Sequence, residues 1–209
     1  MKIDLHVHTA ERSPCARSPE ARLIARAHAC GLDALAFTDH NRFTSPEHLA
    51  QLNAEHAPLR IFSGIEISLY TENEHILVLG LYDPALERED WTYPHLHAFV
   101  RARGGFLALA HPYRYRPYIG LDLERYPPDA IEGHSLNTPV HAAAQIAQLA
   151  EWLGLSVLSN SDAHTSRVLG KYYNLLPRAP HDEGDLLALL RSGTSRPCFP
   201  PREVGLEIC

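Results

Sequence analysis

The histidines of the first predicted strand constrain this chain more than any other feature. Residues 2–9 read Lys-Ile-Asp-Leu-His-Val-His-Thr, in which apolar and polar residues alternate. This alternation is typical of a β-strand and predicts that Asp4, His6 and His8 share one face of it. Two imidazoles that point the same way indicate part of a metal site, and the alternative is an ordinary histidine pair on a surface strand.

Three further histidine-containing segments follow short apolar runs, where a strand is expected to pass into a loop. They are residues 37–40 (Phe-Thr-Asp-His), 109–112 (Leu-Ala-His-Pro) and 161–164 (Ser-Asp-Ala-His), in a chain with 14 histidines. Strand ends that lie on one face of a parallel barrel bring the side chains that follow them together. We therefore expect these segments to converge on one site with the first strand.

Helix and strand signals alternate along the chain. Helices are predicted at residues 19–30, 46–55, 93–103, 140–153 and 183–191, and strands at residues 2–9, 34–38, 59–67, 75–80, 106–110, 130–132 and 156–158. Ser18 and Ser45, each followed by proline and glutamate, are predicted helix N-caps. About seven strands interleaved with helices predict a parallel α/β fold in a single domain over residues 1–209. A closed or nearly closed barrel suits the convergent segments better than an open doubly wound sheet.

Composition and net charge limit the classes of protein to which this chain can belong. The content of 45% hydrophobic and 21% charged residues is ordinary for a globular protein. The net charge of -6 disfavours a broad nucleic-acid-binding surface, although nucleic acid is not excluded as a substrate. No apolar run approaches the roughly 20 residues that span a membrane. No signal peptide is visible, and no zinc-finger spacing links the cysteines, so we expect a cytoplasmic protein with reduced thiols at Cys15, Cys30, Cys198 and Cys209.

Imidazoles and carboxylates are the ligands expected for zinc, manganese or iron. The candidate ligands are His6, His8, His40, Glu66, His75, His111, Asp162 and His164. This is more than one ion needs, so two or three divalent ions are expected. Glu66, between two isoleucines, is costly to bury without a positive partner and is suited to bridge two ions. Such ions would acidify a shared water to hydroxide and neutralise charge on a phosphoryl group.

In chain order, residues 4–9, 37–41, 64–67, 110–112 and 161–164 resemble the motifs of the PHP (polymerase and histidinol phosphatase) family of metal-dependent phosphoesterases. The resemblance implies a distorted seven-stranded β/α barrel with three metal ions at the carboxyl ends of its strands. It also implies the ligands of each ion, with one ion on His6, His8, Glu66 and Asp162, a second on Glu66, His75 and His111, and a third on His40 and His164.

The chain departs from the family pattern in the loop after the first motif. The family usually supplies the third ion with an Asp or His there, but residues 9–15 contain neither. Cys15 and Glu11 are the possible substitutes. Cys15 is the better candidate because a thiolate is a good zinc ligand. The alternative is an ordinary loop cysteine beside a weak or empty third site.

Five further assignments concern catalysis and substrate binding. Asp39 and His164 are predicted catalytic residues. Asp39 is expected to orient a ligand, and its alternative role is a turn or helix cap. Arg114 and Arg116 follow the Ala-His-Pro motif in a long loop and are candidate phosphate-binding residues, the alternative being solvated arginines. Lys171 is a weaker candidate for the same role.

The predicted function is hydrolysis of a small phosphate ester or nucleotide phosphate by a metal-bound hydroxide. One alternative is a nuclease that acts on nucleic-acid ends. A second is a non-catalytic metal-binding module of a larger assembly, against which the nearly complete ligand set argues. A third is metal-assisted hydrolysis of an amide or lactone. No membrane partner is expected, and the sequence makes no prediction of the oligomeric state.

Overall fold

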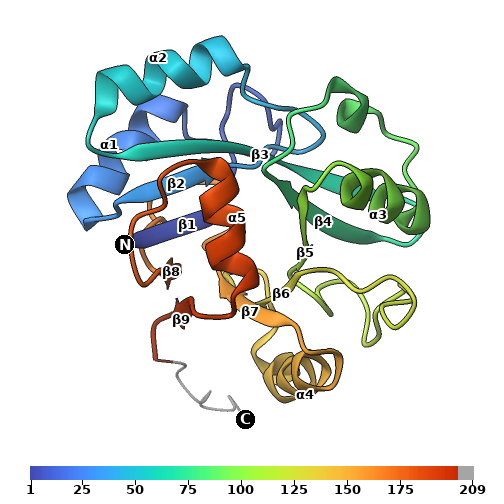
Figure 1. Ribbon diagram of the computed structural model, residues 1–209. Coiled ribbons are helices and arrows are strands. Elements are labelled where there is room, and N and C mark those ends of the chain that lie inside the picture. The colour runs from blue at the N-terminus through green and yellow to red at the C-terminus, as the bar shows by residue number, and fades with distance from the viewer. Residues whose placement is uncertain (202–209) are drawn as a thin grey trace.

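The computed structural model describes residues 1–201, in which nine strands form one sheet and five α-helices pack against it (Figure 1). The strands are β1 (Lys2–Val7), β2 (Ala34–Phe37), β3 (Arg60–Leu69), β4 (Glu74–Leu79), β5 (Phe106–Ala110), β6 (Ala130–His134), β7 (Ser156–Ser159), β8 (Tyr173–Leu175) and β9 (Arg196–Cys198). The α-helices are α1 (Glu20–Cys30), α2 (Pro46–His56), α3 (Tyr93–Ala102), α4 (Ala143–Leu153) and α5 (Glu183–Arg191). Two short 3₁₀ helices are η1 (Pro84–Glu87) and η2 (Val140–Ala142).

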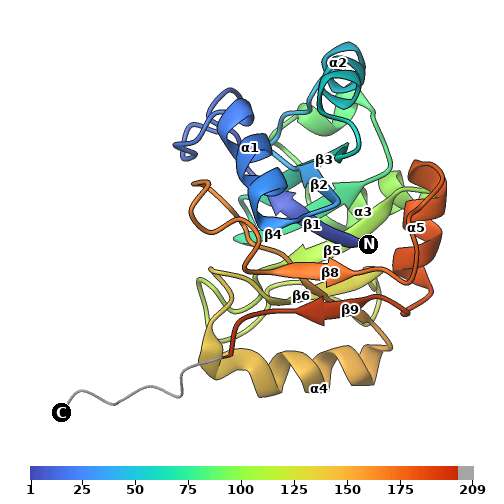
Figure 2. The same ribbon diagram turned by 90° about the vertical axis from the view of Figure 1, so that its left-hand side faces the viewer.

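The sheet is a nearly closed, barrel-like α/β structure in the order β7-β6-β5-β4-β3-β2-β1-β8-β9. Strands β1, β2 and β3 are parallel, as are β5, β6 and β7, and β4 runs antiparallel to both of its neighbours. The two ends of the sheet meet at Ser159, whose Oγ donates to the carbonyl of Cys198 at 2.7 Å and whose N–H donates to Asn174 Oδ1 at 3.0 Å. Figure 1 shows β7 next to β9 at this closure, and Figure 2 shows β9 beside its pairing partner β8.

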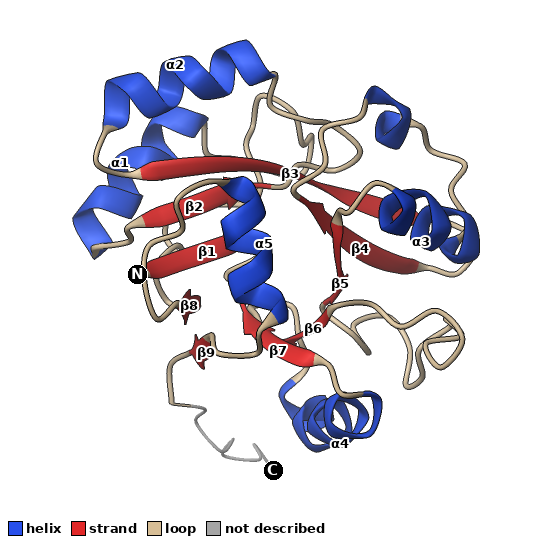
Figure 3. Ribbon diagram, viewed as in Figure 1, coloured by secondary structure: helices blue, strands red, loops and turns tan. Residues whose placement is uncertain are grey.

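Four helices lie outside the barrel, and the fifth closes one end of it (Figure 3). Helices α1 and α2 cover β1 to β3, α3 lies beside β4 and β5, and α4 lies below β6 and β7. The leucines of α5, including Leu186 and Leu190, pack with Ile3 and Leu79 inside the barrel. These contacts bury the end of the barrel that is opposite the carboxyl ends of β1 and β2.

The prediction of seven strands in a parallel arrangement was wrong in two respects. The structure adds β8 and β9, which have three residues each and pair antiparallel to β1 and to each other. Strand β4 is antiparallel because only residues 70–73 connect it to β3, and a parallel connection needs a long crossover. The seven predicted strands and five predicted helices all occur near their expected positions.

Local signals account for some element boundaries and not for others. Ser45 caps α2 as predicted, with its side chain accepting from the His48 N–H at 3.3 Å. Ser18 does not cap α1, because its Oγ accepts from the Ser166 N–H at 3.0 Å. Gly31 ends α1 in the left-handed region at φ 70°.

Three expectations concern the chain as a whole. Cys15, Cys30 and Cys198 are free thiols in the described part of the chain, and Cys209 lies outside it. No helix within residues 1–201 is long and apolar enough to cross a membrane. The extent of a single domain over residues 1–209 stays a prediction.

Candidate metal centre

All eight predicted ligands lie together at one end of the barrel. Most come from the carboxyl ends of parallel strands, and His75 comes from the start of β4, which the antiparallel direction of β4 places at the same end. Their donor atoms form four groups of three, each within 4.8 Å of one another: His8, His40 and His164; His6, His8 and Glu66; His6, His111 and Asp162; His40, Glu66 and His75.

Glu66 is at the centre of the cluster and is fully buried. Its Oε1 lies 2.9 Å from His75 Nδ1 and 3.0 Å from His111 Nε2. Its Oε2 lies 2.9 Å from His40 Nδ1 and 3.2 Å from His8 Nε2. Because His6 Nε2 also lies 3.4 Å from Oε2, Oε1 faces two imidazoles and Oε2 faces three, which is the arrangement of a carboxylate that can bridge two cations.

Asp162 is the second acidic member of the cluster. Its Oδ1 lies 3.1 Å from His8 Nε2 and 3.4 Å from His164 Nδ1. Its Oδ2 accepts from Asn137 Nδ2 at 2.6 Å and from Arg114 Nη1 at 3.4 Å. The Asp162 backbone is left-handed, with φ of 49°, a conformation that costs free energy and is frequent at functional sites.

The polar atoms at the centre fit a divalent cation. Glu66 Oε2 and Asp162 Oδ1 are buried and accept no hydrogen bond, although imidazole nitrogens lie close to both. Nε2 of His6 and Nε2 of His8 are 3.0 Å apart, and both point at these oxygens. Lone pairs that converge in this way repel one another unless a positive charge lies between them.

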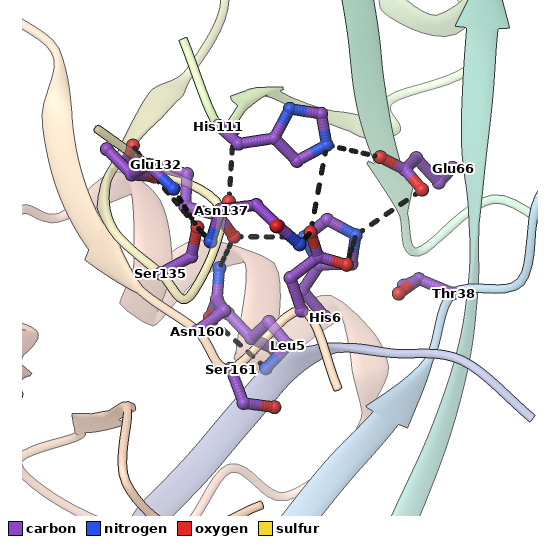
Figure 4. Close-up of polar contacts among 12 residues, drawn as sticks. Leu5, His6, Thr38, Glu66, His111, Glu132, Ser135, Asn137, Asn160 and Ser161 are labelled. Carbon is purple, nitrogen blue, oxygen red and sulfur yellow. Dashed lines mark hydrogen bonds and ion pairs between the residues drawn. The ribbon is translucent and has the colours of Figure 1, made fainter. Parts of the chain in front are cut away.

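Glu132 on β6 is not one of the predicted ligands, but it holds His6 and His111 of the cluster in place (Figure 4). Its Oε1 lies 3.0 Å from His6 Nδ1 and accepts from Asn160 Nδ2 at 2.9 Å, and its Oε2 accepts from the backbone N–H of His111 at 3.0 Å. A proton on His6 Nδ1, shared with Glu132, leaves the Nε2 lone pair free for a cation. Sequence reasoning missed Glu132 and Asn160, although Glu132 lies in a predicted strand, as Glu66 does.

Asp39 supports a different ligand, His8, and contacts none of the eight ligand side chains directly. Its carboxylate accepts from the Thr9 N–H at 2.7 Å, from Arg12 Nε at 2.8 Å and from Ser13 Oγ at 2.6 Å. Ser13 Oγ in turn lies 3.3 Å from His8 Nδ1. The chain Asp39–Ser13–His8 therefore positions the His8 ring, and Ser13 is a third residue that the sequence analysis missed.

Asp4 does not share a face with the two histidines of β1, contrary to the alternation in the sequence. The register of β1 against β2 shifts between Asp4 and Val7, which interrupts the alternation. Asp4 Oδ1 accepts from the N–H groups of His6 and Ser161 at 3.2 and 3.1 Å. Burial raises the pKa of Asp4 to about 7.

Electrostatics inside the cluster favour positive charge. Burial acts to lower the pKa of His6, but Asp162, Glu132 and Glu66 outweigh it and hold this pKa well above its ordinary value. His8 behaves in the same way, with a pKa of about 9. Burial acts to raise the pKa of Glu66, and the surrounding histidines outweigh it and hold that pKa well below the ordinary value.

The cluster opens to solvent on one side. The His6 ring is fully buried, whereas the exposed fraction is 24% for His164, 22% for His40 and 16% for His75. The Arg114 side chain, 29% exposed, lies at the same opening through its contact with Asp162. These side chains therefore form the solvent-facing side of the cluster.

Two loop residues proposed for the third ion lie outside the four donor groups. Cys15 belongs to none of them, and burial together with the nearby carboxylates raises the pKa of its thiol. The Glu11 carboxylate instead accepts from the backbone N–H of Glu20 at 3.1 Å, at the start of α1. The third group in the structure consists of His40 and His164 together with His8.

Two predicted substrate-binding residues are not brought to the cluster. Arg116 Nη1 lies 3.4 Å from the Tyr118 hydroxyl, and Lys171 is exposed. Neither contacts any of the eight donors within the described residues. Only Arg114 of the three predicted cations reaches the centre.

Comparison with profiles of protein families assigns the chain to a family. The PHP domain profile matches residues 4–124, which is more than half of the chain. The chain belongs to the PHP domain family. A second profile, described as PHP-associated, matches residues 141–195, which include α4, β7 and α5. No curated protein matches the sequence.

Solved structures show the same fold as this PHP domain. PsfC from Pseudomonas syringae is 24% identical, covers 96% of this chain and 91% of its own, and has a TM-score of 0.67. A two-domain protein from Bacteroides vulgatus, containing a predicted PHP-like metal-dependent phosphoesterase, is 17% identical, with coverage of 95% and 64% and a TM-score of 0.75. An amidohydrolase from Chromobacterium violaceum with bound sulfate is 18% identical, with coverage of 78% and 88% and a TM-score of 0.62.

Proposed function

We propose that this PHP domain protein is a metal-dependent phosphoesterase that hydrolyses a small phosphate ester or a nucleotide phosphate. The observation that carries the proposal is the Glu66 carboxylate, whose Oε1 faces two imidazoles and whose Oε2 faces three but accepts no hydrogen bond. A buried carboxylate in this position needs a positive partner. Family membership supports phosphate ester hydrolysis as the reaction.

The proposal assigns two or three divalent ions of zinc, manganese or iron to the cluster. One ion would be held by His6, His8, Glu66 and Asp162, a second by Glu66, His75 and His111, and a third by His40 and His164, with Cys15 as the loop residue that completes the third site. When bound, such ions lower the pKa of a coordinated water and offset the charge that develops on a phosphoryl group.

The remaining residues have supporting roles in this proposal. Glu132 fixes the ring of His6, and Asp39 fixes that of His8 through Ser13. His164 stands at the opening, where burial and the neighbouring His8 lower its pKa, and this favours the neutral ring that a proton acceptor needs. Arg114 is the phosphate-binding cation, since Arg116 and Lys171 make no contact with the donors.

Partners and compartment are part of the same proposal. A small phosphorylated molecule suits an opening lined by a few side chains, and the net charge of -6 makes a nucleic-acid partner less suitable. For the compartment we propose the cytoplasm, because Cys15, Cys30 and Cys198 are free thiols and reducing compartments preserve such thiols.

The test is phosphate release by the purified protein. The protein is stripped of metal, reloaded with zinc, manganese or iron, and assayed on phosphomonoesters, nucleotides, a 5′-phosphorylated oligonucleotide and carboxamides. We expect phosphate release from small esters that depends on metal, is lost in His6→Ala and is kept in His141→Ala, which changes an exposed histidine. Carboxamide hydrolysis alone, or bound metal without any turnover, would contradict the proposal.

A further inference from the structure

Arg12, in the loop after β1, is a largely buried arginine that has no part in the function described so far. Its side chain is 14% exposed, and its guanidinium lies between two carboxylates from different parts of the chain. Nε donates to Asp39 Oδ2 at 2.8 Å, and Nη1 lies 2.5 Å from Glu20 Oε1. Within residues 1–201, Arg12 is the one cation paired with Asp39. Charged groups that leave water need paired partners, so Arg12 offsets the charge of Asp39.

Glu20 and α2 hold Arg12 from the side of the protein surface. Glu20 is the first residue of α1, and its Oε2 lies 2.6 Å from Nε2 of His48 on α2, a side chain that is 42% exposed. The Glu20 N–H donates to the Glu11 carboxylate at 3.1 Å, which ties the same loop to α1 a second time. A row of charged groups therefore runs inward from α2 through Glu20 to Arg12. This row fixes the guanidinium where Nε reaches Asp39.

On the inner side, the Ser13 hydroxyl joins Asp39 to the ligand His8. Ser13 Oγ donates to Asp39 Oδ1 at 2.6 Å, accepts from the backbone N–H of His40 at 3.1 Å and lies 3.3 Å from His8 Nδ1. A hydroxyl has a single proton, and a carboxylate paired with a guanidinium only accepts, so the Ser13 proton goes to Asp39. Ser13 and His8 then form a hydrogen bond only when His8 Nδ1 carries the proton. The Nε2 lone pair of His8 is left for the centre.

The neutral donors around Asp39 do not replace Arg12. Thr9 donates to this carboxylate through its backbone N–H at 2.7 Å and through Oγ1 at 2.9 Å. These contacts place the carboxylate, but neither donor carries a charge. Hydrogen bonds between charged groups are about twice as strong as those between neutral groups, which makes Arg12 the strongest donor to Asp39. Without Arg12, a buried carboxylate would have neutral donors alone.

We propose that Arg12 is a positioning residue of the metal centre. Through its pairing with Asp39, it directs the proton of Ser13 away from His8 and so holds the His8 ring with Nε2 toward the other donors. The inference rests on the proposed function, because it takes His8 to be a metal ligand. Its effect is on metal affinity, whichever ester the protein hydrolyses.

The first experiment measures zinc affinity by competition with a chelator. We expect Arg12→Ala to bind zinc roughly 10-fold more weakly than wild type, at the lower end of the range for residues that support metal ligands. Arg12→Lys keeps the charge and should recover part of this loss. The matched control is Arg101→Ala, since Arg101 also pairs with a largely buried carboxylate, that of Asp129 at 2.7 Å, but beside the start of β6 and away from the ligands. Equal affinity in Arg12→Ala and wild type would overturn the inference.

A double-mutant cycle tests whether Arg12 acts through Ser13. In a Ser13→Ala background, Arg12→Ala should reduce zinc affinity by at most about twofold more, because the path to His8 is already broken. The same loss in both backgrounds would overturn the inference, since Arg12 would then support the fold by another route. Circular dichroism checks that each variant is folded, and Arg12→Lys takes the place of Arg12→Ala in the cycle if the latter is not.

A third readout needs no substitution. Proton–nitrogen NMR of the histidine rings in zinc-loaded wild type should show His8 with a proton on Nδ1 and zinc on Nε2. Zinc on Nδ1 of His8 would overturn the inference.

The outcomes separate this inference from the proposed function. Wild type that binds no zinc, manganese or iron would contradict the proposed function and the inference together. Zinc binding that is unaffected by Arg12→Ala would contradict the inference alone. A raised KM for a phosphate ester at unchanged zinc affinity would also overturn it, because Arg12 would then act on the substrate.

Discussion

Glu132 Oε1 lies 3.0 Å from Nδ1 of His6, and both groups are fully buried. The same carboxylate accepts the backbone N–H of His111 through its other oxygen at 3.0 Å. One side chain on β6 thus fixes a ring on β1 and the loop after β5. A histidine that is anchored through Nδ1 presents Nε2 with its lone pair free, which is the state that a metal ion requires.

Replacement of Glu132 by glutamine should therefore weaken metal binding without unfolding the protein. The amide keeps the size of the side chain but loses the charge that fixes the His6 tautomer. We expect metal affinity to fall roughly 10- to 100-fold, which is the range found when a residue that hydrogen-bonds to a metal ligand is replaced. Competition with a chelator measures it, with Glu124→Gln on the exposed loop as control. Equal affinity in both variants would exclude this role.

The stability of the metal-free protein should depend on pH through His8. Burial acts to lower the pKa of His8, but Asp162 and Glu66 raise it to about 9 from an ordinary 6.5. A raised folded-state pKa gives stability that is complete below pH 6.5 and is lost as the pH rises through 9. The free energy of unfolding should fall by about 3 kcal/mol across this window.

Urea denaturation at a series of pH values tests the effect of His8. The metal-loaded protein should show a much smaller fall, because the ions take the place of the protons. Metal-free His8→Gln should lose the part of the dependence that comes from His8 and keep the part that comes from His6, whose pKa is also raised. A metal-free protein whose stability is constant or rises between pH 6.5 and 9 would contradict the electrostatic description of the site.

The far end of the barrel should contribute stability without taking part in metal binding. Leu190 of α5 is fully buried inside the barrel with Ile3 and Leu79. Leu190→Ala should cost about 2–5 kcal/mol of unfolding free energy through the cavity that it leaves. Metal content per folded molecule should stay unchanged, and Leu136→Ala, at a side chain that is 54% exposed, should alter stability little. Loss of metal in folded Leu190→Ala would show that the two ends are coupled.

Helices and central strands could be predicted because their signals are local. Strand β5 and helix α5 occur at the predicted bounds, and Ser45 with the proline after it marks the start of α2. All eight predicted ligands meet because histidines and acids follow or end buried strands, and this pattern is visible without the fold. His75 joins them only because β4 reverses direction.

The features that were missed depend on contacts between distant residues. Strands β8 and β9 have three residues each, too few for a periodic pattern, and they form through pairing with β1 and with each other. Glu132 is far from His6 in sequence, so its role depends on β6 standing near β1 in the closed barrel. The shift that turns Asp4 away from the histidines is a local irregularity in pairing, which alternation alone does not reveal.

The central claim is that Glu66 joins the surrounding histidines into one centre for several metal ions. Its most direct test is the metal content per chain, measured by elemental analysis of wild type and Glu66→Gln after identical loading and desalting. We expect two or three equivalents in wild type and at most one in the variant, because only the third proposed site does not use Glu66, with both proteins folded by circular dichroism. Equal metal content in the two proteins, or no metal in folded wild type, would contradict the account.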